Sequence, residues 1–463
     1  MGRGNAESSE RRLLAEPVTP QALGRTGERQ VLAANAAASL IPHFKLTAGD
    51  QLDPKKSDPL TAARVRLRDA YTPSQPVTNR SMLAGRGPVL RALISAIEEQ
   101  RLHSVIYGER GIGKTSLLHA LEQAAREARY LVVYVSCGAD SSFDEVFRAI
   151  AAGIPLLYVQ GYGPTTPQAE HGDTVASLLP ATSISTRTAS ELLARVVGTR
   201  VLVLLDEFDR SESRLFRHNV AELLKNLSDR SVRVQLVVAG VATDLTELVE
   251  RIPSIQRNIF ALEVPKMSNE EVGELIATGA RACGLSFDSA ATRSITAVAA
   301  GLPYLASLIS HHAGLKTIGD GRMRVTEADV SNAVTEALDE LRARLSKHTQ
   351  NQIDACQSNG ITYVLGTLAG SSNHGEGRFS PQDVRSLFPK HEDAARFAAK
   401  IEELVEQNIL ISAIEDDYGR LFRFLEEGAS PYLSLLAAKT RFLDDGEERV
   451  AKSVTVAAPG GRS

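Results

Sequence analysis

Between residues 81 and 265, short and nearly continuous apolar runs alternate with amphipathic stretches. The runs are rich in Val, Ile and Leu, as in strands that are buried on both faces of a parallel sheet. These predicted strands cover residues 103–107, 130–136, 201–205, 232–241 and 259–264. The amphipathic stretches have the apolar period of helices and cover residues 88–100, 116–128, 142–152, 188–198 and 215–227. The alternation predicts a three-layer α/β domain around a parallel sheet.

The pattern changes after Pro265, where the predicted strands stop and helices continue to about residue 345. Ser268 and Glu271 have the spacing of a capping box that opens the first of these helices. From about residue 346, three helices are followed by two short apolar strands, at 409–414 and 421–424. Three helices and a β-hairpin are the layout of a winged helix-turn-helix.

These changes of pattern divide the chain into five predicted segments. Scattered prolines and little periodicity predict a partly ordered arm at the start of the chain, with one helix near residues 21–40 and another at residues 61–71. The segments are the arm (1–80), an α/β core (81–265), a helical lid (266–345), a winged-helix domain (346–444) and a flexible tail (445–463). Within the core, residues 161–186 are rich in Gly, Pro, Thr and Ser. An inserted loop of this length is usually functional or disordered.

Composition excludes several other classes of protein. Of the 463 residues, 43% are hydrophobic and 23% are charged, which is ordinary for globular domains. The net charge of -4 gives no overall basic surface for nucleic acid. Cys137, Cys283 and Cys356 are too far apart in sequence for a zinc motif or a disulfide framework. With no signal peptide and no apolar run long enough to span a bilayer, we expect a cytoplasmic protein without a membrane partner.

The strongest motif follows the first predicted strand. Residues 108–115 read Gly-Glu-Arg-Gly-Ile-Gly-Lys-Thr, the G-x-x-x-x-G-K-[ST] pattern of phosphate-binding loops, and lead directly into a predicted helix. Glycines let the backbone wrap closely around phosphates, and the loop N–H groups and the helix N-terminus then face the anion. The predicted nucleotide-binding residues here are Gly108, Glu109, Arg110, Gly111, Ile112, Gly113, Lys114, Thr115 and Ser116. The alternative, a glycine-rich turn without a ligand, is disfavoured by this strand–loop–helix context.

A second motif adds the chemistry of hydrolysis. The apolar strand at 201–205 ends in Asp206 and Glu207. We expect Lys114 to reach the β- and γ-phosphates of ATP, while the Thr115 hydroxyl and the Asp206 carboxylate hold Mg²⁺. Glu207 is placed to orient an attacking water and accept its proton. The alternative is a strand that merely ends in two solvated acids.

Together the two motifs resemble those of the AAA+ ATPases, in particular the origin-recognition-type branch and the related signal-transducing (STAND) NTPases. The resemblance covers roughly residues 81–430. It implies an AAA+ P-loop core with a helical lid and a C-terminal winged helix-turn-helix, and ATP and Mg²⁺ as cofactors. Residues 83–86 look like the stretch that precedes the core in this branch and packs near the adenine. Gly85 and Arg86 are therefore predicted nucleotide contacts.

The resemblance also suggests residues that sense the nucleotide and complete the reaction. Thr243 follows the fourth strand, where the family has a sensor, often Asn, that hydrogen-bonds the γ-phosphate or a water. Arg257 falls where the family supplies an arginine finger to a neighbouring subunit, which stabilises charge in the transition state. Arg251 competes for this role, and a plain surface arginine is a third alternative. A finger in trans implies a nucleotide-dependent homo- or hetero-oligomer.

One part of the predicted lid departs from the AAA+ pattern. Many AAA+ proteins have an arginine early in a lid helix that senses the γ-phosphate. Residues 300–306 read Ala-Gly-Leu-Pro-Tyr-Leu-Ala and contain no arginine. They resemble instead the Gly-x-Pro turn of the signal-transducing branch. This makes Pro303 a candidate nucleotide contact and favours a nucleotide switch.

The predicted winged helix raises the question of DNA binding. Its reading helix, residues 392–407, contains Arg396 and Lys400. The acidic residues of the same helix are Glu392, Asp393, Glu402, Glu403 and Glu406. Acidic groups repel a phosphate backbone, and base readout is normally framed by Lys and Arg. A surface for protein packing therefore fits slightly better than a DNA reader.

Three functions follow from these observations. The first is an ATP hydrolase that couples turnover to remodelling or assembly with a macromolecular partner of unknown identity. The second is a STAND-like switch or scaffold in which hydrolysis is slow. The third is an origin-recognition-like ATPase that binds DNA. The intact pair Asp206 and Glu207 favours the first, and the lid without an arginine favours the second.

Overall fold

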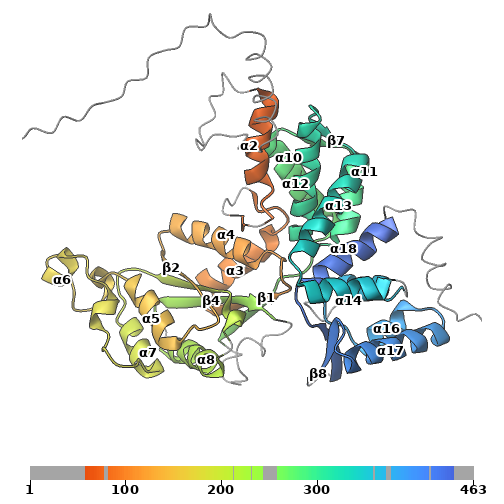
Figure 1. Ribbon diagram of the computed structural model, residues 1–463. Coiled ribbons are helices and arrows are strands. Elements are labelled where there is room, and N and C mark those ends of the chain that lie inside the picture. The colour runs from red at the N-terminus through yellow and green to blue at the C-terminus, as the bar shows by residue number, and fades with distance from the viewer. Residues whose placement is uncertain are drawn as a thin grey trace, which may run out of the picture. The chain divides into compact units, whose positions relative to one another are not determined.

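Figure 1 shows the protein as a computed structural model. The structure describes residues 58–442, except 74, 78–81, 212, 231, 243–257, 358–359, 372–376 and 417–418. The predicted tail and residues 1–57 of the predicted arm lie outside the described residues. Within the part described, no helix combines the length and the apolar character that crossing a bilayer requires.

The core is a five-stranded parallel sheet in the order β2-β3-β4-β1-β5. Its strands are β1 (His103–Gly108), β2 (Leu131–Ser136), β3 (Val201–Asp206), β4 (Val234–Val241) and β5 (Ile259–Glu263). Helices connect β1 to β2, β2 to β3 and β3 to β4, and such crossovers allow neighbouring strands to run parallel. All six residues of β3 are buried, as its continuous apolar pattern predicts.

Helices cover both faces of this sheet (Figure 1). They are α3 (Gly87–Glu98), α4 (Lys114–Glu127), α5 (Phe143–Ala152), α7 (Thr186–Ala194) and α8 (Arg214–Asp229). Successive side chains of a strand point to opposite faces. Leu202 and Leu204 of β3 therefore belong to the buried cluster formed with α3 and α4. Val203 belongs to the cluster formed with α5, α7 and α8. The predicted three-layer α/β fold is confirmed.

Residues 161–186 contain regular structure rather than one long irregular loop. The helix α6 (Pro167–Glu170) and the 3₁₀ turn η3 (Val175–Leu178) lie within them. Val175 and Ile184 are buried in the same cluster as α5. The backbone N–H of Val175 also donates to the carbonyl of Ile154 at 2.8 Å. A few apolar residues in a polar stretch thus tie the insertion to the core.

The lid is built from α10 (Asn269–Cys283), α11 (Ser289–Ala299), α12 (Pro303–Gly319) and α13 (Glu327–Ala343), with a short parallel pair, β6 (Ser286–Phe287) and β7 (Arg324–Val325). The predicted capping box of Ser268 and Glu271 is present. The helix predicted at residues 61–71 is α2 (Pro59–Ala70), which packs against α10 and α12, whereas the one predicted near residues 21–40 lies outside the described residues. Tyr71, at the end of α2, is only 1% exposed, and its hydroxyl donates to the carbonyl of Ile276 at 2.6 Å. This end of the arm is therefore part of the hydrophobic core of the lid.

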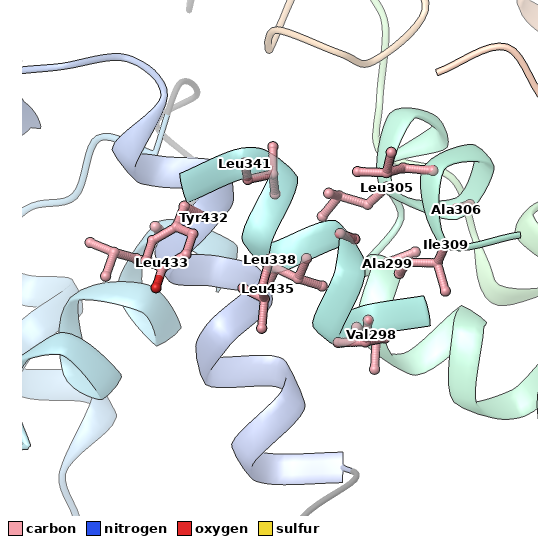
Figure 2. Close-up of a cluster of buried hydrophobic side chains, with 14 of the residues drawn as sticks. Val298, Ala299, Leu305, Ala306, Ile309, Leu338, Leu341, Tyr432, Leu433 and Leu435 are labelled. Carbon is pink, nitrogen blue, oxygen red and sulfur yellow. The ribbon is translucent and has the colours of Figure 1, made fainter. Parts of the chain in front are cut away.

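The C-terminal region has the helices and the hairpin of a winged helix-turn-helix. Its elements are α14 (Lys347–Gln357), α15 (Ile361–Ser371), α16 (Pro381–Leu387), α17 (His391–Glu406), β8 (Ile411–Asp416), β9 (Gly419–Phe424) and α18 (Ala429–Phe442). Strands β8 and β9 pair antiparallel. Leu433 and Leu435 of α18 share one buried cluster with Leu338 of α13 and Val298 of α11 (Figure 2). The lid and the winged-helix region are thus joined through a common core.

Replacing Gly279 by alanine tests the docking of α2 on the lid. A Cβ at Gly279 would lie 2.4 Å from Cε1 and Cζ of Tyr71, a rigid ring that is itself buried. We expect Gly279→Ala to lower the free energy of unfolding by about 1–3 kcal/mol through overpacking.

The matched control is Gly273→Ala on the same helix, where a Cβ would meet no described atom within 4 Å. Helix propensity predicts that this change stabilises the protein by up to about 1 kcal/mol. Denaturant unfolding measures both variants. Equal free energies of unfolding for the two would contradict the docking of Tyr71 on α10.

Candidate functional site

The loop between β1 and α4 is shaped by its glycines. Gly111 and Gly113 have φ angles of 76° and 99°, a left-handed conformation that side chains with a Cβ rarely adopt. A Cβ at Gly113 would meet no described atom within 4 Å, so the loop is open on that side. Gly113 is also the N-cap of α4 and has no side chain to cap the helix. The first N–H groups of a helix have no acceptor within the helix, so those of α4 suit an anion bound at the loop.

Lys114 lies across this loop. Its side chain is largely buried, with 9% of the residue exposed. The Nζ donates to the carbonyl oxygens of Gly108 at 2.8 Å and Glu109 at 2.9 Å. The ammonium group is thus held by two backbone carbonyl oxygens at the start of the same loop.

Arg86 donates a hydrogen bond to the same loop. It is 2% exposed and donates from Nη2 to the carbonyl of Ile112 at 3.1 Å. Its Nη1 is buried and has no hydrogen-bond partner among the described residues. Burial lowers the pKa of the Arg86 guanidinium, and the nearby Glu271 carboxylate opposes this shift. Gly85 is left-handed, with φ of 69°, and a Cβ there would lie 2.8 Å from Cβ of Glu271.

Asp206 ends β3 at the carboxyl edge of the sheet and is 3% exposed. The Tyr134 hydroxyl donates to its Oδ2 at 2.5 Å, and the Glu207 backbone N–H donates to its Oδ1 at 2.8 Å. Burial raises the pKa of the Tyr134 phenol, and its hydrogen bond to the Asp206 carboxylate raises it further. Each oxygen of this buried carboxylate therefore has a defined donor.

Glu207 has a left-handed backbone, with φ of 53°, which is uncommon for a residue other than glycine. Its Oε2 accepts from the Arg210 guanidinium at 2.9 Å and from Oγ of Ser136 at 3.2 Å. The Glu207 carboxylate in turn raises the pKa of Arg210. Glu207 is thus held on the β2 side of the sheet edge, where Ser136 pairs with Asp206 in register.

Tyr134, Ser136 and Arg210 belong to the site but were not predicted from the sequence. Tyr134 and Ser136 come close to the acidic pair only because β2 pairs with β3. The sequence showed only that Tyr134 and Ser136 are polar residues near the carboxyl end of a predicted buried strand. That signal becomes specific only once the strand order is known.

Residues of the lid and the winged-helix region contact the loop. The Nζ of Lys266 lies 3.3 Å from Oε1 of Glu109, and Arg110 forms an ion pair with Glu427. The Cβ of Tyr304 lies 3.1 Å from a Cβ built on Gly111.

The turn predicted at residues 301–303 brings Tyr304 to that position. Gly301 has φ of 78°, and a Cβ there would lie 2.7 Å from the carbonyl oxygen of Met267, so the turn requires glycine. Pro303 then begins α12, one residue before Tyr304.

Of the other predicted site residues, the structure describes Ser116 but not the sensor or the arginine fingers. Ser116, in the first turn of α4, accepts at Oγ from the Val77 backbone N–H at 3.0 Å. Its hydroxyl therefore contacts the segment that precedes the core. Thr243 and both arginines considered for the finger, Arg251 and Arg257, lie outside the described residues.

The oxygen donors of the site fit Mg²⁺, which prefers carboxylate, hydroxyl and phosphate oxygens. Asp206 offers a buried carboxylate, and Thr115 offers a hydroxyl in the first turn of α4. Among the described residues, no group of three His, Cys, Asp or Glu side chains could hold a metal ion by itself. Mg²⁺ at this site would take its remaining ligands from nucleotide phosphates and water.

Comparison with known proteins agrees with this geometry. Residues 97–249 match the model of the AAA domain family. No curated protein matches the sequence.

Several solved structures are similar to the chain. The ORC1 protein of Aeropyrum pernix in complex with DNA is 18% identical and has a TM-score of 0.43, over 82% of this chain and 98% of that one. The Aeropyrum pernix ORC2 protein is 19% identical and has a TM-score of 0.43, over 84% and 98%. A point mutant of Thermotoga maritima RuvB is 15% identical and has a TM-score of 0.40, over 73% and 93%. These values are too low to transfer a function.

The family assignment rests on the AAA domain match and on the features described above. The match spans the glycine loop, β3 with its acidic end, and β4. The loop stands between a buried strand and a helix, as the phosphate-binding motif requires. Residues 97–249 therefore match an AAA domain, and the α/β core that contains them has the three-layer fold of a P-loop NTPase.

Proposed function

We propose that this protein binds ATP with Mg²⁺ in the glycine loop and hydrolyses it slowly, so that the nucleotide acts mainly as a conformational switch. The observation that carries the proposal is the open left-handed loop crossed by the buried Lys114. A buried ammonium that donates to carbonyl oxygens of the loop itself is suited to move onto the phosphates of an entering nucleotide.

The roles of the other residues follow from their positions. The N–H groups of the loop and of α4 would orient the phosphates, and Thr115 and Asp206 would hold the metal ion. Mg²⁺ supplies neutralisation of the charge that develops on the β- and γ-phosphates. Glu207 would orient the attacking water and accept its proton.

Slow turnover is supported by the partners of Glu207. Its Oε2 accepts from Arg210 and from Ser136. A carboxylate oxygen that already accepts from a guanidinium and a hydroxyl has little capacity left to accept from an attacking water. Glu207 would therefore have to leave Arg210 before this oxygen acts on water. This restraint on one of the two carboxylate oxygens, together with a turn at residues 300–306 that contains no arginine, favours the switch over a fast remodelling enzyme.

The contacts around the loop suggest how a switch could reach the rest of the molecule. Glu109 pairs with Lys266, whose Nζ also donates to the carbonyl of Gly370 in α15 at 3.0 Å. Arg110 pairs with Glu427, just before α18. Phosphates in the loop would compete for Lys266 and Arg110. We propose that nucleotide binding thereby changes the contacts of the lid and the winged-helix region.

The charges of the winged-helix region favour a protein partner over DNA. Lys400 pairs with Glu403 at 2.8 Å, and Arg420 pairs with Glu402 at 2.6 Å. These cations have acidic partners within the chain, so phosphate contacts would have to displace them. DNA binding remains the less favoured candidate. Assembly into an oligomer through Arg257 belongs to the same proposal, with that arginine supplied to a neighbouring subunit.

Lys114→Ala tests nucleotide binding. We expect it to weaken ATP binding by at least about 10-fold, because charge-assisted hydrogen bonds to the phosphates are lost. Isothermal titration measures the affinity, and circular dichroism checks that the fold is retained. Lys225→Ala on α8 is the control and should bind ATP as the unmodified protein does. Unchanged affinity in Lys114→Ala would mean that the loop is not the nucleotide site.

Glu207→Gln separates binding from hydrolysis. The amide keeps the shape of the side chain but cannot accept a proton, so turnover should fall by about 10²–10⁴-fold while ATP affinity is retained. A steady-state phosphate-release assay at saturating ATP measures this. Turnover equal to that of the unmodified protein would remove Glu207 from the mechanism.

Arg210→Ala tests whether the ion pair restrains Glu207. Without the guanidinium, the carboxylate is released to act as a base, and we expect turnover to rise about two- to five-fold. High salt screens the ion pair, so it should also raise the turnover of the unmodified protein. It should change the turnover of Arg210→Ala little. A fall in turnover would instead assign Arg210 a supporting role in the reaction.

A further inference from the structure

We infer that Tyr134 is a positioning residue that fixes the Asp206 carboxylate for Mg²⁺. This inference rests on the proposed function, because it concerns the metal ligand of that same site. Tyr134 is the fourth residue of β2 and lies outside the two motifs that define the loop and the acidic pair.

The strand register brings Tyr134 to the metal ligand. Tyr134 pairs with Leu204 of β3, and Ser136 pairs with Asp206. Alternation places Tyr134 on the face of the sheet that α4 covers, where it packs with Leu204. From there its hydroxyl reaches Oδ2 of Asp206 at 2.5 Å.

Two donors then determine the orientation of the carboxylate. The Tyr134 hydroxyl occupies one lone pair of Oδ2, and the Glu207 N–H, at 2.8 Å, occupies one lone pair of Oδ1. Each carboxylate oxygen has a second lone pair that remains available to a metal ion or its water. Without the phenol, one side-chain-directed donor, the Glu207 N–H, would remain among the described residues, and the broad terminal torsion of Asp206 would be less restricted. Hydrogen bonds to a residue that binds a metal ion set the orientation of that residue and its affinity for the metal.

The ring of Tyr134 is itself held by the helix that begins in the glycine loop. His119 of α4 stacks on it with ring centroids 5.1 Å apart and an interplanar angle of 7°. His119 Nδ1 lies 3.4 Å from Glu122, which also pairs with Arg126 at 2.8 Å. Thr115 and His119 are on the same helix, so the stack links the two predicted metal ligands, Thr115 and Asp206, through a rigid contact. A tyrosine that only filled space would not need its hydroxyl on the carboxylate.

The test compares the Mg²⁺ dependence of ATP binding in Tyr134→Phe and in the unmodified protein. Phenylalanine keeps the ring and its stack and removes only the hydroxyl. We expect ATP affinity in EDTA to be unchanged and the Mg²⁺ concentration that gives half-maximal enhancement of binding to rise by roughly 10-fold. The control is Tyr130→Phe, which removes a phenol hydroxyl from the residue just before β2. It should show the Mg²⁺ dependence of the unmodified protein.

A double-mutant cycle with Asp206→Asn shows whether Tyr134 acts through the carboxylate. In the Asp206→Asn background, Tyr134→Phe should have no further effect on the Mg²⁺ dependence. An unchanged Mg²⁺ dependence in Tyr134→Phe, or an equal shift in the Asp206→Asn background, would overturn the inference alone. Failure of the unmodified protein to bind ATP, or binding that does not respond to Mg²⁺, would overturn the proposed function as well.

Discussion

Five parallel strands end at one edge of the sheet, and every charged group of the proposed site depends on that edge. β1 runs into the glycine loop, β2 ends at Ser136 and β3 ends at Asp206. A one-residue slip of a strand would move its side chains to the opposite face. Because β3 is buried throughout and pairs with both β2 and β4, its register is fixed. The position of the acidic pair therefore follows from the packing of the whole core.

Three buried charges lie around this edge and the adjoining loop, and each has specific hydrogen-bond partners. Lys114 is held by two loop carbonyls, Asp206 by a phenol and a backbone N–H, and Arg86 by the carbonyl of Ile112. A buried charge without such partners is strongly destabilising. These contacts hold the charged groups in defined positions. In the proposed function, Lys114 would exchange its carbonyl partners for phosphate oxygens, and Asp206 would hold Mg²⁺. Glu207, which is more exposed, is held by Arg210 in the same way.

The sequence was sufficient for the parts of the structure that depend on local pattern. The buried strands, the glycine loop at residues 108–115 and the acidic end of β3 were predicted because each is a contiguous stretch with its own physical signature. The capping box of Ser268 was predicted for the same reason. The roles assigned to these residues in binding and hydrolysis remain proposals.

Contacts between distant segments could not be predicted in this way. Tyr134 meets Asp206 only through the β2–β3 register, and Tyr71 enters the lid only because Gly279 leaves room for its ring. The apolar residues that anchor the insertion, such as Val175, are sparse within a polar stretch. The joint core of the lid and α18 likewise depends on packing between helices that are about a hundred residues apart.

Hydrogen–deuterium exchange of the unmodified protein with and without ATP and Mg²⁺ tests the central claim most directly. If the loop binds the phosphates, its backbone N–H groups become hydrogen-bonded to the nucleotide and are protected from exchange. We predict strong protection at residues 109–115 and at the end of β3, with less protection when EDTA replaces Mg²⁺. Exchange at residues 109–115 that is the same with and without saturating ATP would contradict this prediction.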